Sequence, residues 1–168
     1  MTAVVIVIAL AVAAVVGAVA TRLRPRRRPA YEGEARILVP FSGALDPAVL
    51  DAAIRVARAE GAVLVAAYLL VVPLQYPEDS AQKDKVAVAL PLLEAVEHAA
   101  LRAGVPVDAR IEKGRSLTHA LRRLWEVERF TRIVAPASGF TPKELAWILT
   151  HAPAETIVLS PGQDAVAA

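Results

Sequence analysis

Two loops of this sequence carry residues that could hold an anion. The first, PFSGALD, contains Ser42 and Gly43 directly after an apolar run. The second, APASGFTPKE, contains Gly139, Thr141 and Lys143 between another apolar run and a stretch with helical spacing. Loop N–H groups, the first turn of a helix and a lysine side chain hold phosphate in many α/β proteins. These five residues are therefore the candidate cofactor-binding site.

The second loop is nevertheless poorly suited to a nucleotide. Pro136 and Pro142 have no backbone N–H to offer a phosphate, and Gly139 is the one glycine between them. Thr141 and Glu144 form the Thr-x-x-Glu pattern of a capping box, which explains Thr141 without any ligand. We interpret the loop as a site that has lost its nucleotide or never held one. The alternative is a small anion held at the helix N-terminus.

Other chemistry has less support in the sequence. The absence of cysteine excludes disulfides, thiol catalysis and cysteine-bound zinc. The three histidines show no metal-ligand spacing, and no serine has the Gly-x-Ser-x-Gly context of a nucleophile. We therefore predict no catalytic residue, no metal site, no bound cofactor and no enzymatic activity. A hydrolase that uses serine and histidine near strand ends is the least supported alternative.

The strands and helices that position the two loops alternate along the chain. Apolar runs at 36–41, 62–73, 131–136 and 154–161, with a partly exposed alternating run at 107–114, predict five strands. Amphipathic stretches at 47–60, about 80–103, 116–130 and 141–153 predict the helices between them. This order predicts a doubly wound five-stranded parallel sheet with helices on both faces. Ligands of such sheets bind beyond the carboxyl ends of the strands, where both loops lie.

The alternating order of strands and helices along the chain, the opening RILVP and the ending HAPAETIVLSP resemble the universal stress protein family over about residues 35–161. The resemblance implies a five-stranded α/β fold and a homodimer through the last strand. It also implies a nucleotide site, because many members bind ATP or AMP while others do not. Nucleotide-binding members carry an aspartate after the first strand, and its place falls here on Ser42.

The family's second motif also departs from its pattern. It reads glycine, two residues, glycine, nine residues, and glycine with serine or threonine. The first glycine falls on Pro136, the second on Gly139 and the final pair near Pro142 and Lys143, so that about two residues remain of the nine. The resemblance therefore implies the fold with a degenerate ATP-binding motif.

The N-terminal region has the composition of a membrane anchor. Residues Ala3 to Ala20 contain only alanine, valine, isoleucine, leucine and one glycine, and a helix of that length spans roughly 27 Å, close to a hydrocarbon core of about 30 Å. The run RLRPRRRP follows, with five arginines. We predict an anchor at 1–21, a basic linker at 22–35, the α/β domain at 36–163 and a tail at 164–168. A cleaved signal peptide ending at AVA, residues 18–20, is the alternative.

Charge places the domain and limits its partners. A basic flank stays on the cytoplasmic side of a membrane and contacts anionic lipid headgroups, which predicts a single-pass protein of the cell membrane with a cytoplasmic domain. Beyond the five clustered arginines, 14 basic residues face 17 acidic ones, a net charge of −3 that argues against nucleic acid. A membrane protein is a possible partner.

The sequence thus predicts a membrane-tethered regulatory or interaction module that does not bind ATP. The alternative is a sensor of ATP, AMP or a small anion with a non-standard phosphate loop.

Overall fold

The computed structural model describes residues 34–160. Among the helices within that range, none is both long enough and apolar enough to cross a membrane. The predicted anchor at 1–21 and the predicted tail at 164–168 lie outside the described residues, as does nearly all of the basic linker at 22–35. These three segments stay predictions.

The described residues form the predicted alternation of strands and helices. The strands are β1 (Arg36–Phe41), β2 (Val63–Val71), β3 (Val107–Gly114), β4 (Arg132–Pro136) and β5 (Glu155–Leu159). The helices are α2 (Pro47–Glu60), α3 (Lys83–Arg102), α4 (Leu117–Val127) and α5 (Pro142–His151). All strand pairs are parallel, in the order β3-β2-β1-β4-β5. The prediction of a doubly wound parallel sheet is confirmed.

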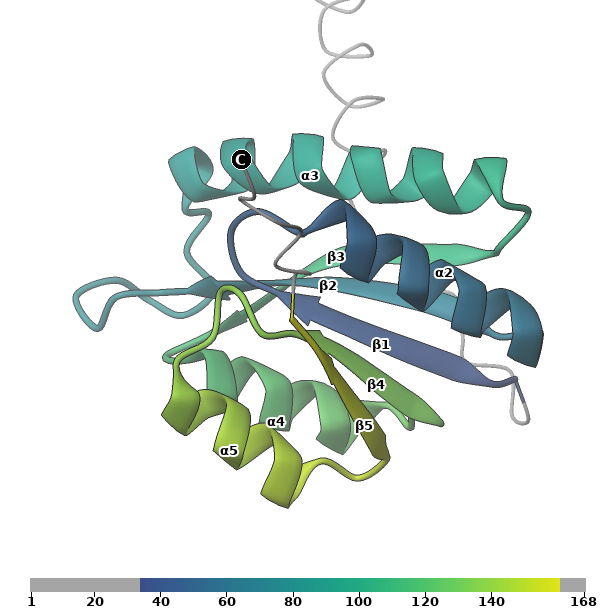
Figure 1. Ribbon diagram of the computed structural model, residues 1–168. Coiled ribbons are helices and arrows are strands. Elements are labelled where there is room, and N and C mark those ends of the chain that lie inside the picture. The colour runs from purple at the N-terminus through teal and green to yellow at the C-terminus, as the bar shows by residue number, and fades with distance from the viewer. Residues whose placement is uncertain (1–33, 161–168) are drawn as a thin grey trace, which may run out of the picture.

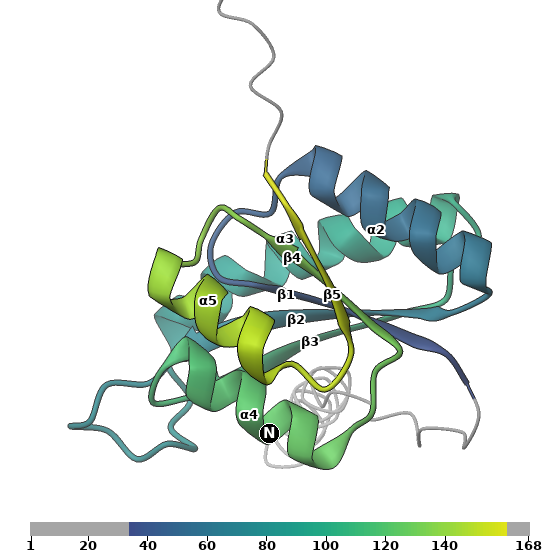
Figure 2. The same cartoon turned by 60° about the horizontal axis from the view of Figure 1, so that its bottom comes forward.

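The helices cover both faces of the sheet. In Figures 1 and 2, α2 and α3 lie on one face and α4 and α5 lie on the other. Alternate residues of the central strands face opposite ways, so β1 contributes Ile37 and Val39 to the core under α2 and α3 and Leu38 to the core over α4 and α5. Both cores are apolar, which explains why the central strands read as continuous hydrophobic runs.

Local signals set most helix boundaries. Asp46 Oδ1 accepts a hydrogen bond from Ala48 N at 2.7 Å, and Ser116 Oγ accepts one from His119 N at 3.1 Å, so that both helices begin at an N-cap. Gly61 ends α2 with a φ of 60°, a left-handed conformation that suits glycine.

The helix α3 begins at Lys83, three residues later than the predicted start near Ser80. The cause is a contact from a distant strand. Lys113 Nζ donates to Ser80 O at 2.7 Å and to Asp79 O at 3.3 Å, which holds this segment as a loop. Gln82, the N-cap residue of α3, has a φ of 43°.

A group of largely buried charged side chains runs from the start of β1 along β3 to the segment after α4. This basal ion cluster consists of Arg36, Asp108, Arg110, Glu112 and Glu128. Arg110 forms a bidentate pair with Glu128, at 2.6 and 2.7 Å, and Arg36 Nη2 lies 2.9 Å from Asp108 Oδ2 and 3.3 Å from Glu128 Oε2. The two arginine side chains are only 5% and 4% exposed. The cluster connects β1, β3 and the segment after α4 beneath the sheet.

The seam between α4 and α5 is aromatic. The rings of Trp125 and Trp147 stack with centroids 5.2 Å apart and planes 4° apart. His151 also stacks on Trp147, with ring centroids 4.9 Å apart, and Arg122 Cζ lies 5.7 Å from the centre of the Trp147 ring. The stack fixes how α5 lies on α4.

Candidate functional site

The two predicted loops meet at the point where the strand order reverses. Strand β1 pairs with β2 on one side and with β4 on the other, so the loops after β1 and β4 leave adjacent strands at the same edge of the sheet. Ser42 Oγ donates a hydrogen bond to Gly139 O at 3.1 Å. The structure therefore brings Ser42, Gly43 and Gly139 to one place.

The contact between the two loops requires glycine at 139. Gly139 has a φ of +89°, and a Cβ atom there would lie 2.9 Å from Ser42 O. Gly43 also has a positive φ, +86°, but the space around its Cβ position is open. The backbones are thus close at Gly139, and Ser42 uses its hydroxyl to bind the facing loop.

The first turn of α5 satisfies its own polar groups. Glu144 Oε2 accepts hydrogen bonds from Thr141 N at 2.7 Å and from Thr141 Oγ1 at 2.8 Å, while Glu144 N donates to Thr141 Oγ1 at 3.3 Å. The predicted capping box is therefore present. A carboxylate already occupies the position where an anion would meet the helix N-terminus. Lys143, in the same turn, is exposed.

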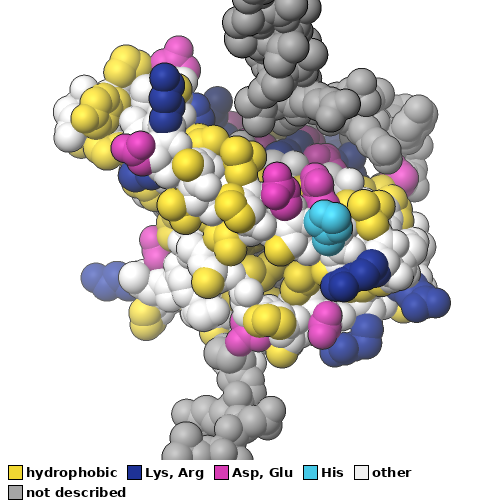
Figure 3. Space-filling model, turned by 90° about the horizontal axis from the view of Figure 1, so that it is seen from above, with side chains coloured by type: hydrophobic (Ala, Val, Ile, Leu, Met, Phe, Trp, Pro, Cys, Tyr) yellow, Lys and Arg dark blue, Asp and Glu magenta, His cyan; other side chains and the backbone are white. Residues whose placement is uncertain are grey.

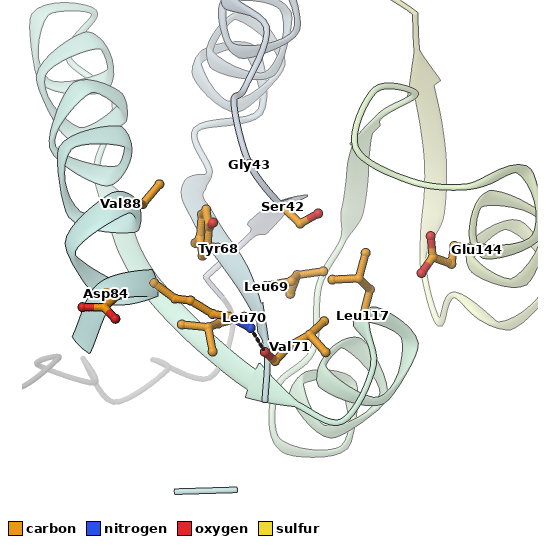
Figure 4. Close-up of a pocket in the computed structure, with 11 residues that line it drawn as sticks. Ser42, Gly43, Tyr68, Leu69, Leu70, Val71, Asp84, Val88, Leu117 and Glu144 are labelled. Atoms are coloured by element: carbon orange, nitrogen blue, oxygen red, sulfur yellow. Dashed lines mark hydrogen bonds between the residues drawn. The ribbon is translucent and has the colours of Figure 1, made fainter. Parts of the chain in front are cut away.

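A cavity of about 660 Å³ opens beside Ser42, above the strand next to the contact between the two loops. Its floor is the end of β2, one wall is the start of α3, and the other wall is formed by the starts of α4 and α5 (Figure 4). The lining residues are Ser42, Gly43, Tyr68, Leu69, Leu70, Val71, Asp84, Lys85, Val88, Leu117 and Glu144. Of the five residues predicted as a site, Ser42 and Gly43 belong to this lining, whereas Gly139, Thr141 and Lys143 do not.

The sequence analysis missed the part of this lining that comes from β2 and α3. The signal was present, because the carboxyl end of β2 must lie at the same edge as the ends of β1 and β4. Val88 of α3 lines this wall and is 61% exposed. A single exposed apolar residue is common on protein surfaces, so Val88 alone did not signal the wall in the sequence.

The charged groups at the cavity have local roles. Lys85 Nζ donates a hydrogen bond to Val71 O at 2.7 Å (Figure 4, dashed line). Glu144 caps α5, and Asp84 lies in the first turn of α3, where the positive end of the helix dipole favours a carboxylate. Within residues 34–160, no group of three or more histidine, aspartate or glutamate side chains is placed to hold a metal ion.

The fold is that of the universal stress proteins. No family model matches the chain, and no curated protein matches it in sequence. Among solved structures, the universal stress protein from Archaeoglobus fulgidus in complex with dAMP is similar, with a TM-score of 0.59 and 16% identity over 74% of this chain and 96% of that chain.

Two further solved structures agree. A universal stress protein family protein from Arabidopsis thaliana with AMP bound has a TM-score of 0.57 and 17% identity over 77% of this chain and 94% of that one. A universal stress protein in complex with cAMP has a TM-score of 0.58 and 17% identity over 74% and 96%. The resemblance seen in the sequence is confirmed at the level of the fold.

Proposed function

We propose that this chain, which has the universal stress protein fold, is a non-catalytic regulatory or interaction module that does not hold ATP. The observation that carries the proposal is the contact between the two loops at the reversal of strand order. Ser42 Oγ lies 3.1 Å from Gly139 O, so the side chain at the position of the family's aspartate binds the neighbouring loop.

The same region lacks the groups that a triphosphate needs. A phosphate site points several backbone N–H groups at one anion, and Pro136 and Pro142 have none. The N–H of Thr141 donates to Glu144 Oε2 at 2.7 Å. A phosphate at the start of α5 would therefore have to displace a carboxylate and then remain beside it, which like charges oppose.

A nucleotide or small-anion sensor is the second candidate. The observations that favour it are the cavity of about 660 Å³ at the carboxyl edge of the sheet and the dAMP, AMP and cAMP bound in three similar structures. In this alternative the nucleotide would depend on Lys85 and the end of β2, because the loop after β4 offers few donors.

Calorimetry of the full-length chain with ATP and AMP separates the two candidates. We expect no binding tighter than about millimolar, which corresponds to about −4 kcal/mol and a few non-specific contacts. The variant P136G is the matched control, and it should not restore binding because the shortened loop still lacks donors. A micromolar Kd for either nucleotide in the unmodified chain would favour the sensor.

The proposed module is tethered to the cell membrane with its domain in the cytoplasm. Support comes from the sequence: the apolar run at 3–20 is followed by five arginines, which favour the cytoplasmic side and anionic lipids. The full chain should resist extraction from membranes with carbonate and with high salt. A mature N-terminus at Thr21 in cells would instead identify a cleaved signal peptide.

The proposed assembly is a homodimer through β5. This strand lies at the edge of the sheet, and its residues Thr156 to Leu159 are half-buried rather than buried. An apolar edge strand of this kind needs a cover against uncontrolled pairing. Light scattering of the chain at micromolar concentration should give a dimer mass, and a monomer mass would contradict this arrangement. A membrane protein remains a possible partner.

A further inference from the structure

We infer that the cavity above the end of β2 binds an uncharged, largely apolar small molecule. The inference rests on the proposed function, because it assumes that the loop after β4 does not bring a phosphate to this edge. It goes further by naming the class of ligand that the remaining cavity fits.

The size and the lining of the cavity carry the first step. A volume of about 660 Å³ lies within the range of sites for drug-sized molecules, roughly 300–1,000 Å³. Most of its lining is apolar and comes from Tyr68, Val71, Val88 and Leu117, together with the nearly buried Leu69 and Leu70. Apolar contact is therefore the main source of affinity that this cavity can offer.

An exposed apolar group at the cavity also favours an apolar ligand. Val88 lies on the wall formed by α3 and is 61% exposed, so a ligand in the cavity would remove it from water. Hydrophobic side chains reach the surface over α2 and α3 (Figure 3). A second depression shares Asp84 and Lys85 with the cavity and is otherwise lined by Tyr76, Ser80, Gln82 and Lys83, with Tyr76 48% exposed. The lining beyond Asp84 and Lys85 is therefore mainly polar, and the apolar lining belongs to the cavity itself.

The loop that carries Tyr76 is held in place by side chains of the next elements. Arg115 Nη1 donates to Pro73 O at 2.7 Å and to Tyr76 O at 2.9 Å. Arg123 Nη1 forms an ion pair with Glu78 at 2.6 Å in the same loop. This anchoring holds Tyr76 at the second depression, beside Asp84 and Lys85, so little ordering of the loop is needed on binding.

The charges at the cavity determine the charge of the ligand. Lys85 is bound to Val71 O, Glu144 is bound to Thr141, and Asp84 stands at the positive end of α3. The two carboxylates thus meet backbone N–H or helix-dipole donors, and Lys85 is held at its place by a hydrogen bond to a neutral backbone carbonyl. A charged ligand would lose its hydration in the apolar cavity without gaining a dedicated partner, which opposes its binding. An uncharged ligand avoids this loss.

The test uses the absence of cysteine from the chain. The full-length variant V88C, in phosphatidylcholine nanodiscs, carries a single thiol on the cavity wall. The matched control is V127C. Val127 is 66% exposed at the last residue of α4, and the cavity lining includes the first residue of that helix but not Val127. Mass spectrometry measures the rate at which a water-soluble maleimide labels each thiol.

Three probes with one apolar body separate the charge classes: 4-phenylbutan-1-ol, 4-phenylbutyrate and 4-phenylbutylamine, at equal free concentrations. We expect the alcohol to slow labelling of V88C by about twofold once it reaches its Kd, with a smaller effect of both charged probes and no effect on V127C. Stronger protection by either charged probe, equal slowing of both thiols, or no slowing by the alcohol up to its solubility limit would overturn the inference.

The same assay distinguishes a failure of the proposed function from a failure of the inference about the apolar ligand. If micromolar ATP protects V88C, the proposed function fails whatever the alcohol does. If ATP has no effect and the alcohol has none either, the proposed function stands and the inference about the apolar ligand fails.

Discussion

The basal ion cluster and the carboxyl ends of the strands use charge in opposite ways. The cluster runs from the start of β1 along β3 and gathers two arginines and three carboxylates, with both arginine side chains nearly buried. At the carboxyl ends of the strands, where proteins of this fold type bind ligands, Lys85 and Glu144 are hydrogen-bonded to backbone groups and the loops meet through the uncharged contact from Ser42 to Gly139. In this domain the strongest charge pairing holds strands together, and the ligand edge is left mainly apolar.

The largest expected effect comes from breaking the basal ion cluster. In R110A, the carboxylates of Asp108 and Glu128 would keep only Arg36 from the described cluster. Loss of one partner from a buried pair costs about 3 kcal/mol of the free energy of unfolding, which urea denaturation measures. The matched control is R123A, which removes an exposed pair with Glu78 and should cost at most about 1 kcal/mol. Equal losses in the two variants would contradict the larger role assigned to the buried ion pairs.

The stabilisation by Arg110 should also persist at every pH in the physiological range. Burial lowers the pKa of Arg110, but its hydrogen bonds to Glu128 and the charges of Asp108, Glu128 and Glu112 outweigh this, so the pKa is raised. A raised pKa of a cationic group stabilises the folded state below the unfolded pKa, and that contribution is lost only as the pH rises through the folded pKa. The difference in stability between the wild type and R110A should therefore not shrink between neutral and mildly alkaline pH, measured by denaturation in both buffers.

The next effect sharpens the comparison at the carboxyl-terminal edge. G139A should lower the free energy of unfolding by about 2 kcal/mol, because it combines a positive φ with a Cβ atom 2.9 Å from Ser42 O. G43A has a similar φ and open space, so its loss should be about 1 kcal/mol. Thermal denaturation of both variants isolates the close approach of the loops. A larger loss in G43A than in G139A would argue against it.

The smallest effect is expected from removing the hydrogen bond itself. S42A deletes the exposed bond to Gly139 O and should cost about 0.5 kcal/mol, since an exposed donor and acceptor are then satisfied by water. It should leave the weak response to ATP in calorimetry unchanged. A gain of micromolar ATP affinity in S42A would show that this contact was the barrier to nucleotide binding.

The sequence predicted what depends on local pattern. The strand runs, the helical stretches between them and the cap at Thr141 follow from residues close in the chain, and the doubly wound sheet follows from general rules of α/β topology. It did not predict the late start of α3, because Lys113, more than 30 residues away, holds the preceding loop.

The basal ion cluster was also missed. Arg36 and Asp108 are separated by 72 residues, and their strands lie on either side of β2. No spacing along the chain signals such a pair. The candidate site was predicted only in part. Ser42 and Gly43 could be recognised because they follow a strand in the sequence. Val88 joins them only because α3 packs on the sheet, which no local spacing signals.

The stacked pair Trp125 and Trp147 makes the tryptophan signals of the chain sensitive to a single region, the seam between α4 and α5. These are the only two tryptophans in the chain, and both lie at the seam of α4 and α5 with their rings 5.2 Å apart. The indole emission and the exciton signal in near-ultraviolet circular dichroism therefore describe how α5 sits on α4. Because α5 follows directly from the loop that holds Gly139, a ligand that shifts this loop changes both signals.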